Sequence, residues 1–188
     1  GSRPHFNFSC NFLFLSLIIY TRSGQLFYYT KLWLARTVFY LNARTDLLQY
    51  SMQVKINIDG GSRGNPGPGA AAYVICQTDG KILAQEGHFM PHCTNNQAEY
   101  TALKLALIKS AELGATELFI ESDSLLLVKQ YLGEYKIKHP DLAARMAVIR
   151  RLAAPFTLHI KHVLRHLNKA PDALANKAMD AKQSVGFN

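Results

Sequence analysis

Residues 54–69 read VKINIDGGSRGNPGPG, and this stretch decides the fold. Its first half alternates apolar and polar residues, which is the period of a half-buried β-strand. From residue 60 onward it holds five glycines and two prolines, which indicate a tight turn. An apolar run over residues 70–76 follows as a second strand. The stretch therefore predicts a strand pair, with Asp59 closing the first strand on its polar face.

The remaining chain predicts alternating strands and helices. Asp79-Gly80 is a hairpin signal, so residues 82–89 are expected to return as a third strand. Thr94 and Gln97 have the spacing of a capping box at the start of a helix. Three strands followed by alternating elements predict an α/β fold, a five-stranded mixed sheet with helices on both faces. The further strands are expected over residues 118–120 and 157–163, and the helices over 96–113, 124–132, 141–152 and 170–181.

Four acidic residues stand at the ends of these predicted elements. Asp59 opens the glycine-rich turn, Glu99 lies early in a helix (TNNQAEY), Asp123 follows a strand (LFIESDS), and Asp172 starts the last helix (NKAPDALANKAMD). Clustered carboxylates repel one another unless cations neutralise them, so a cluster would suit hard divalent metals. Two such metals about 3.5–4 Å apart can cleave a phosphodiester. Taken singly, each acid could equally be a cap or turn residue.

The glycine-rich turn has two interpretations. No GK[ST] follows it and the next element is a strand, so the P-loop and dinucleotide-binding interpretations fail. The structural interpretation is a tight hairpin. The functional interpretation is that glycines let the backbone approach a nucleic-acid strand closely.

With these motifs in order, residues 52–181 resemble type 1 ribonuclease H, which is the ribonuclease HI family. The resemblance implies an endonuclease that cuts the RNA strand of RNA–DNA hybrids with two Mg²⁺ ions, for which Mn²⁺ is a possible substitute, and leaves 5′-phosphate ends. It implies that Asp59 bridges both metals. Glu99 and Asp123 would hold the metal near the leaving group, and Asp172 the metal that activates water.

The resemblance also implies contacts with the hybrid. In the family the glycine-rich turn lies along the minor groove of the hybrid. The two asparagines that match Asn95 and Asn96 reach base edges and sugars, where the 2′-hydroxyl distinguishes RNA from DNA. Thr94 matches a position near a DNA-strand phosphate. Helix capping is the competing interpretation for Thr94 and Gln97. The implied substrate-binding residues are Gly61, Ser62, Arg63, Asn65, Thr94, Asn95, Asn96 and Gln97.

The loop before the last helix, VLRHLNKAPD, leaves one catalytic role open. The family often has a mobile histidine there, so the resemblance implies that His166 assists proton transfer or product release. Arg165 is the alternative, in contact with the scissile region. The link GEYKIKHP carries no tryptophan and few basic residues, so the chain resembles the family form that lacks the basic protrusion. Weaker hybrid binding is expected, because fewer phosphates are neutralised.

Composition agrees with a polyanionic partner. The net charge is +8 and the pI is about 9.5, which favours a polyanionic partner. The resemblance implies that this partner is an RNA–DNA hybrid duplex. Three cysteines without CxxC spacing predict reduced thiols and a cytoplasmic location. No motif suggests an obligate protein partner, and a monomer is expected.

Residues 1–51 form an N-terminal hydrophobic and aromatic extension before a predicted ribonuclease H domain at 52–188. They hold 12 of the 20 aromatic residues and one acid, Asp46. The run FLFLSLIIY over residues 12–20 is shorter than the roughly 20 residues that a membrane span needs. Two interpretations stay open: upstream sequence carried along with the domain, as Gly1-Ser2 and Met52 suggest, or an accessory segment.

Two other function classes also stay open at this point. One is a non-catalytic module that binds hybrid or double-stranded RNA, against which the four intact acids argue. The other is a membrane-associated or complex-bound protein that acts through residues 1–51.

Overall fold

The computed structural model describes residues 51–187. The extension over residues 1–50, with its apolar run, lies outside the described residues, and the proposed boundary before Met52 stays a prediction. Among the helices of the described part, none is both long and apolar enough to cross a membrane.

The sheet has six strands in the order β5-β4-β1-β2-β3-β6. β1, β2 and β3 pair in antiparallel fashion, whereas β4 pairs in parallel with β1 and β5 in parallel with β4. The mixed sheet predicted from the sequence is therefore present. The strands are β1 (Gln53–Ser62), β2 (Gly67–Gln77), β3 (Ile82–Cys93), β4 (Glu117–Ser122), β5 (Thr157–His162) and β6 (Val185–Phe187).

The expectation of five strands was wrong, because β6 adds a sixth at the edge. It pairs with β3 in antiparallel fashion, with Gly186 opposite Glu86. A three-residue strand with a central glycine carries no alternating pattern, so its sequence gave no strand signal.

A second correction concerns the end of β1. The strand continues past Asp59 to Ser62, because Gly60 and Gly61 still pair with Ala71 and Ala70 of β2. The turn itself is shorter than its glycine content suggested. Asp59 therefore lies within the strand, where it pairs with Ala72 of β2.

The helices agree with the predicted ranges to within a residue or two. Thr94 Oγ1 accepts a hydrogen bond from Gln97 N at 3.3 Å, and Gln97 Oε1 accepts one from Thr94 N at 2.9 Å. The capping box is thus confirmed as the start of α2. The helices are α2 (Asn95–Glu112), α3 (Leu125–Tyr131), α4 (Pro140–Ala153) and α5 (Lys169–Ala181), with a 3₁₀ turn η1 (Arg165–Leu167) before α5.

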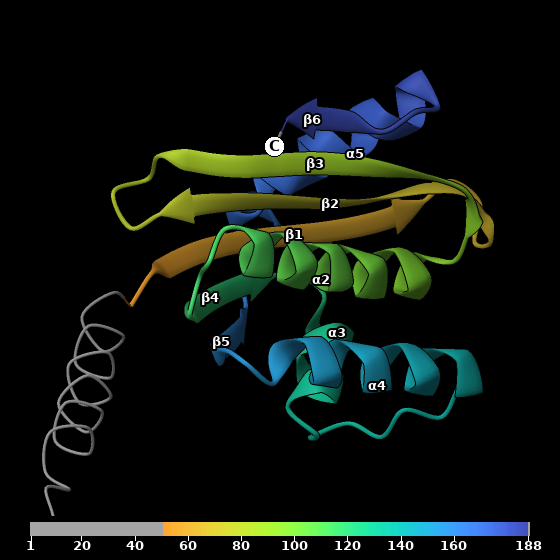
Figure 1. The fold of residues 1–188 in the computed structure, drawn as a ribbon. Coiled ribbons are helices and arrows are strands. Elements are labelled where there is room, and N and C mark those ends of the chain that lie inside the picture. The colour runs from red at the N-terminus through yellow and green to blue at the C-terminus, as the bar shows by residue number, and fades with distance from the viewer. Residues whose placement is uncertain (1–50, 188) are drawn as a thin grey trace, which may run out of the picture. The chain divides into compact units, whose positions relative to one another are not determined.

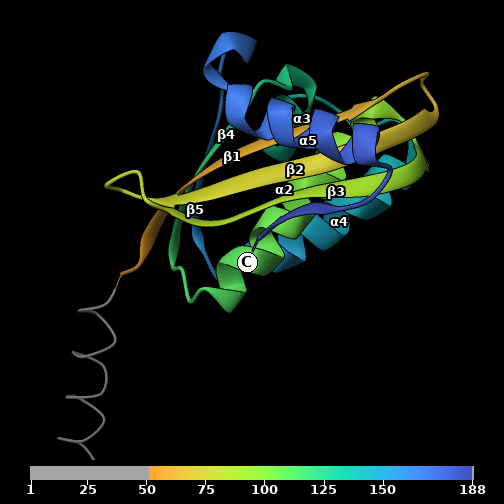
Figure 2. The same cartoon turned by 90° about the horizontal axis from the view of Figure 1, so that it is seen from above.

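Two hydrophobic clusters lie on opposite faces of the sheet. On one face α2, α3 and α4 cover alternate residues of β1, β2 and β4, such as Ile56, Tyr73 and Ile120. On the other face Ala70 and Ala72 of β2 pack against α5. Figure 1 shows α2 and α5 on the two sides of the sheet, and Figure 2 shows α5 lying across the strands. Helices on both faces are therefore confirmed.

The topology brings the C-terminal ends of β1, β4 and β5 together, because these strands are parallel neighbours. β1 and β4 run in parallel with Ile58 opposite Ser122, so the next residues, Asp59 and Asp123, follow side by side. β5 ends beside β4, where Val163 N donates a hydrogen bond to Ser122 O at 2.9 Å. From this end of the strands the chain reaches α5 through η1. The first turn of α5, with Asp172, is therefore delivered to this edge.

We expect Gly87→Ala to destabilise the domain by about 1–3 kcal/mol, because the added methyl overpacks the contact between β3 and α5. A Cβ at Gly87 would lie 2.5 Å from the Leu174 carbonyl oxygen of α5. Urea unfolding measures the loss. His92→Ala, at an exposed position of the same strand, is the control and should stay within about 0.5 kcal/mol of wild type. Equal midpoints for the two variants would contradict this packing.

Candidate metal centre

The four predicted acids line one cavity of about 330 Å³. They come from different elements: Asp59 from β1, Glu99 from the start of α2, Asp123 from the residue after β4, and Asp172 from the first turn of α5. Each of Asp59, Glu99 and Asp123 places an oxygen within 4.8 Å of oxygens of the other two. The chain thus gathers at one point acids that are far apart in sequence.

Gly60 permits the approach of Glu99. A Cβ at Gly60 would lie 2.3 Å from the backbone nitrogen of Glu99 and 2.4 Å from the carbonyl carbon of Ala98. Only a residue without a side chain lets the start of α2 lie this close to β1. Gly61 differs, because a Cβ there would meet nothing within 4 Å. Sequence analysis missed this division of roles, for which the adjacent glycines were the only signal.

Without a bound cation, the acids of the cluster disfavour one another's ionisation. Burial, followed by the charges of Asp123 and Asp172, raises the pKa of Asp59 to about 6. Burial, followed by the charges of Asp59 and Asp123, raises the pKa of Glu99 well above its usual value. Both shifts oppose ionisation, so the cluster holds negative charge that the protein does not itself balance.

The donor set fits a hard divalent cation. Within the described part of the chain, the buried Oε2 of Glu99 has no hydrogen-bond partner. An orphaned carboxylate oxygen is costly when buried, and a cation would supply its missing partner. All the candidate ligands are oxygens, which are the atoms that Mg²⁺ and Mn²⁺ prefer.

Asp172 is held differently from the other three acids. Its Oδ1 accepts a hydrogen bond from Arg165 at 2.9 Å, and its Oδ2 accepts one from Asn176 at 3.3 Å. Arg165 also lines the cavity, and its side chain is largely exposed. His166, the predicted catalytic histidine, is exposed on η1 and is not among the residues lining the cavity. Of the two alternatives, Arg165 is the one beside the acids, and the role of His166 stays a prediction.

The predicted substrate-binding residues divide between two cavities. Gly61, Ser62, Arg63 and Asn95 line the cavity with the acids. A second cavity of about 260 Å³ holds the rest of the set, and sequence analysis missed three of its lining residues. The predicted members there are Asn65, Thr94, Asn96 and Gln97, and the missed ones are His139, Asp141 and Leu142.

Hydrogen bonds tie the glycine-rich turn to the start of α2. Asn95 Oδ1 accepts from Ser62 N at 2.7 Å and from Ser62 Oγ at 2.9 Å. Asn95 N in turn donates to Asn65 Oδ1 at 3.1 Å. The turn is therefore a braced surface beside both cavities, and both interpretations of it, hairpin and site, have support.

The amides of this segment have unequal roles. Both polar atoms of the Gln97 side chain are hydrogen-bonded. Its Oε1 caps α2, and its Nε2 donates to Asp141 Oδ2 at 3.0 Å. Asn95 braces Ser62, whereas Asn96 is exposed at the second cavity. The capping interpretation therefore accounts for Thr94 and Gln97 but not for Asn96.

Sequence analysis also missed Asn168, the residue before α5. It is 1% exposed and donates to Ile58 O at 2.8 Å and to Asp123 Oδ1 at 3.0 Å. Its position in the NKAPD segment, four residues before Asp172, was the only available signal.

Comparison with known proteins finds a family model and relatives that match about two thirds of the chain. A family model described as reverse transcriptase-like matches residues 57–178. The chain is 42% identical to ribonuclease HI of Halobacterium salinarum, over 68% of this chain and 65% of that protein. It is also 42% identical to a bifunctional protein of Mycobacterium tuberculosis, over 69% of this chain. The chain thus spans about two thirds of the first relative and 36% of the second.

A solved structure shows the same fold. The chain is similar to LC11-RNase H1, which was crystallised in complex with RNA/DNA hybrid, with a TM-score of 0.66 and 35% sequence identity. The likeness covers 69% of this chain and 98% of that one.

The raised pKa of Asp59 predicts a pH-dependent penalty in metal-free protein. Between about pH 4 and 6 the folded state holds a proton that the unfolded state has lost, so stability falls as pH rises through this window. At about pH 7.5 in EDTA, Asp59→Asn should therefore raise Tm by roughly 3–8 °C. The gain should vanish near pH 4, where wild-type Asp59 is also protonated. Thermal melts across this range measure both effects.

Glu112→Gln serves as the control for this measurement. Glu112 is an exposed acid at the end of α2, and within residues 51–187 its one ion pair is with Lys109. Its neutralisation should therefore leave Tm nearly unchanged. Equal gains from both substitutions would show a general charge effect instead of strain at the acid cluster.

Proposed function

The chain belongs to the ribonuclease H family, and on this premise we propose that it hydrolyses the RNA strand of RNA–DNA hybrids. The observation that carries the proposal is the half-buried acid cluster with its orphaned Glu99 oxygen. A module that only bound nucleic acid would gain nothing from gathering three mutually repelling carboxylates in one cavity. A metal-dependent phosphodiesterase needs such a cluster.

Each acid has a proposed part in holding the cations. Asp59 is coupled by charge to Asp123, Asp172 and Glu99, and it would hold both metals. Glu99 and Asp123 would hold the one near the leaving group, and Asp172 the one near the attacking water. When bound, the Mg²⁺ ions would lower the pKa of that water and neutralise the phosphate charge. The products would carry 5′-phosphate and 3′-hydroxyl ends.

Arg165 would act beside Asp172. It is an exposed guanidinium held at the cavity rim by a charge-assisted hydrogen bond. From there it can contact a phosphate oxygen of the RNA strand without leaving Asp172. We therefore assign phosphate contact to Arg165, and His166 remains the candidate for product release.

The braced turn and the second cavity would receive the hybrid. Gly61 offers open backbone at the acid cavity, and Ser62 and Asn95 are fixed beside it. Asn96 is exposed for contact with bases and sugars of the minor groove, where the 2′-hydroxyl distinguishes RNA. The Thr94 cavity is the proposed place of the DNA strand. The hybrid bound to LC11-RNase H1 supports this choice of substrate.

The remaining features of the proposal follow from composition. Mg²⁺ is the proposed cation, with Mn²⁺ as a substitute, because every donor is oxygen. The basic charge favours the polyanion, and the cysteine pattern favours a reducing, cytoplasmic setting. We propose that the chain acts as a monomer.

Neutralising Asp59 should abolish cleavage. With Mg²⁺, wild-type protein should cut a labelled hybrid, and Asp59→Asn should lower kcat by more than about a thousandfold, or about 4 kcal/mol of transition-state stabilisation. Double-stranded RNA and double-stranded DNA should remain uncut, as should the hybrid in EDTA. Glu112→Gln is the matched control and should cut normally. Cleavage by folded Asp59→Asn at near the wild-type rate would show that the metal centre is misassigned.

Asn96→Ala and Asn95→Ala should separate binding from bracing. Asn96 is exposed and makes its proposed contact only with substrate, so its loss should raise KM for the hybrid severalfold with kcat and Tm little changed. Asn95 also holds Ser62, so its loss should raise KM and lower Tm together. Steady-state kinetics at one salt concentration and thermal melts measure both. An unchanged KM in Asn96→Ala would remove this residue from the interface.

A further inference from the structure

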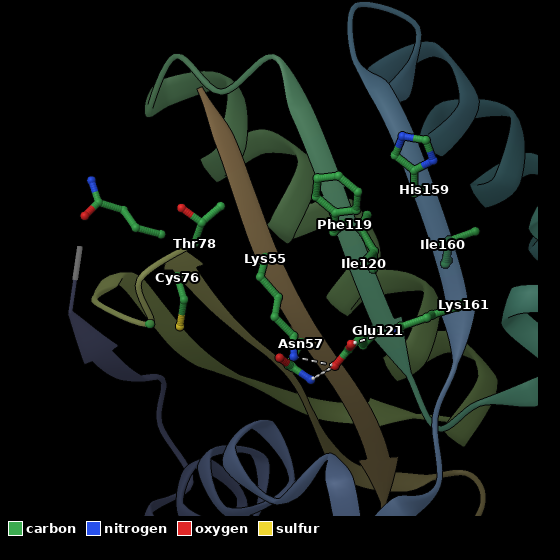
Figure 3. Close-up of a pocket in the computed structure, with 12 residues that line it drawn as sticks. Lys55, Asn57, Cys76, Thr78, Phe119, Ile120, Glu121, His159, Ile160 and Lys161 are labelled. Carbon is green, nitrogen blue, oxygen red and sulfur yellow. Dashed lines mark hydrogen bonds and ion pairs between the residues drawn. The ribbon is translucent and has the colours of Figure 1, made fainter. Parts of the chain in front are cut away.

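A row of hydrogen-bonded polar side chains leads along one face of the sheet to the metal centre. It starts at Glu121 of β4, which is 9% exposed and sits between two ammonium groups. Lys55 Nζ lies 3.0 Å from Glu121 Oε2, and Lys161 Nζ lies 3.1 Å from Oε1. Asn57 Nδ2 donates to Oε2 at 3.1 Å. Figure 3 shows these four side chains meeting from β1, β4 and β5 at the edge of a cavity of about 630 Å³.

The row continues from Asn57 to the metal centre. Asn57 Nδ2 also donates to Asn168 Oδ1 at 3.1 Å. Asn168 Nδ2 then donates to Ile58 O and to Asp123 Oδ1. Two amides therefore link the Glu121 carboxylate to the carboxylate of a candidate metal ligand.

The two ends of the row dictate the orientation of both amides. An ionised carboxylate and a backbone carbonyl can only accept hydrogen bonds. Glu121 therefore requires the amino group of Asn57 on its side, and the second N–H of that group is directed at Asn168. The oxygen of Asn168 must then face Asn57, so its amino group faces Ile58 and Asp123. With both N–H groups used, Asn168 is held in one orientation.

We propose, resting on the proposed function, that Asn168 is a positioning residue that presents Asp123 to the metal, and that Glu121 orients it through Asn57. The Asn168 amide holds one oxygen of Asp123 and the end of β1 together. Groups that orient metal ligands in this way commonly affect metal affinity by about 10–100-fold when they are replaced.

The direct test is cation binding by the full chain. Titration calorimetry with Mn²⁺ should show Asn168→Ala binding about tenfold or more weakly than wild type. Asn168→Asp, which keeps the shape but cannot donate to Ile58 or Asp123, should bind as weakly. The Mg²⁺ concentration for half-maximal cleavage should rise in parallel, while KM for hybrid at saturating Mg²⁺ stays within about twofold. Wild-type Mn²⁺ affinity in folded Asn168→Ala would overturn the proposal.

Met146→Ala is the control for lost stability. Met146 is buried in α4, away from the acids, and its truncation should leave a destabilising cavity. If Met146→Ala lowers Tm without changing Mn²⁺ affinity, the effect at Asn168 is specific. Equal loss of Mn²⁺ affinity in both variants would reduce Asn168 to a structural role and overturn the proposal.

A double-mutant cycle tests the part played by Glu121. Glu121→Ala keeps Asn168 in place but removes the acceptor that orients Asn57, so it should weaken Mn²⁺ binding in the same direction and to a smaller extent. In the Asn168→Ala background it should add nothing, because its effect passes through Asn168. Additive losses, or unchanged Mn²⁺ affinity in Glu121→Ala, would disprove that Glu121 orients Asn168 through Asn57. Glu121→Ala also keeps the test available if Asn168→Ala fails to fold.

Failure of this inference differs from failure of the proposed function. If wild-type protein neither binds Mn²⁺ nor cuts hybrid, the metal centre itself is wrong. If wild type does both and the Asn168 variants behave as wild type, only the positioning role is wrong.

Discussion

Repulsion among half-buried carboxylates is the constraint on which the rest of this domain depends. Asp59, Glu99 and Asp123 place oxygens within 4.8 Å of one another, and burial raises the pKa of the first two. Nothing about such a cluster favours folding, so the surrounding structure must hold it. Pairing of Asp59 with Ala72 of β2 fixes its backbone, and the parallel pairing of β1 with β4, which ends with Ile58 opposite Ser122, places it beside Asp123.

The close approach of α2 depends on the same constraint. Glu99 reaches the cluster only because Gly60 has no side chain, and the capping box at Thr94 sets where the helix begins. The turn that precedes this helix in space is tied to it through Asn95 and Ser62. A braced scaffold therefore presents the acids, while the backbone of Gly61 and the side chains of Asn96 and Arg165 stay exposed beside them.

The sheet face that α5 leaves uncovered has a chemical character of its own. Phe119 and His159 stack there with ring centroids 4.9 Å apart, beside the Lys55–Glu121–Lys161 group. Polar residues on this face alternate with core residues on the other, as strand geometry requires. The alternation that builds the core therefore also aligns Asn57 and Glu121 with the acids at the strand ends.

Much of the fold could be predicted from local pattern. Alternation in VKINI, the glycine-rich turn and the Thr94–Gln97 capping box each depend on neighbouring residues, so their elements were found within a few residues of their true bounds. β6 was missed because three residues with a central glycine have no pattern, and the length of β1 was missed because strand pairing overrode the glycines. Local propensity is a weak guide wherever a partner strand supplies the hydrogen bonds.

The sequence by itself determined which four acids to expect in one site, because each stands in a distinctive motif at an element end. Only the tertiary structure decided how they are held. Asn168 lies 110 residues from Ile58 and 45 from Asp123, and Gly60 meets α2 across the sheet. It also decided that Arg165, and not His166, lies beside Asp172. Such contacts join residues whose separation leaves no periodic signal, so they exist only once the sheet and helices have packed.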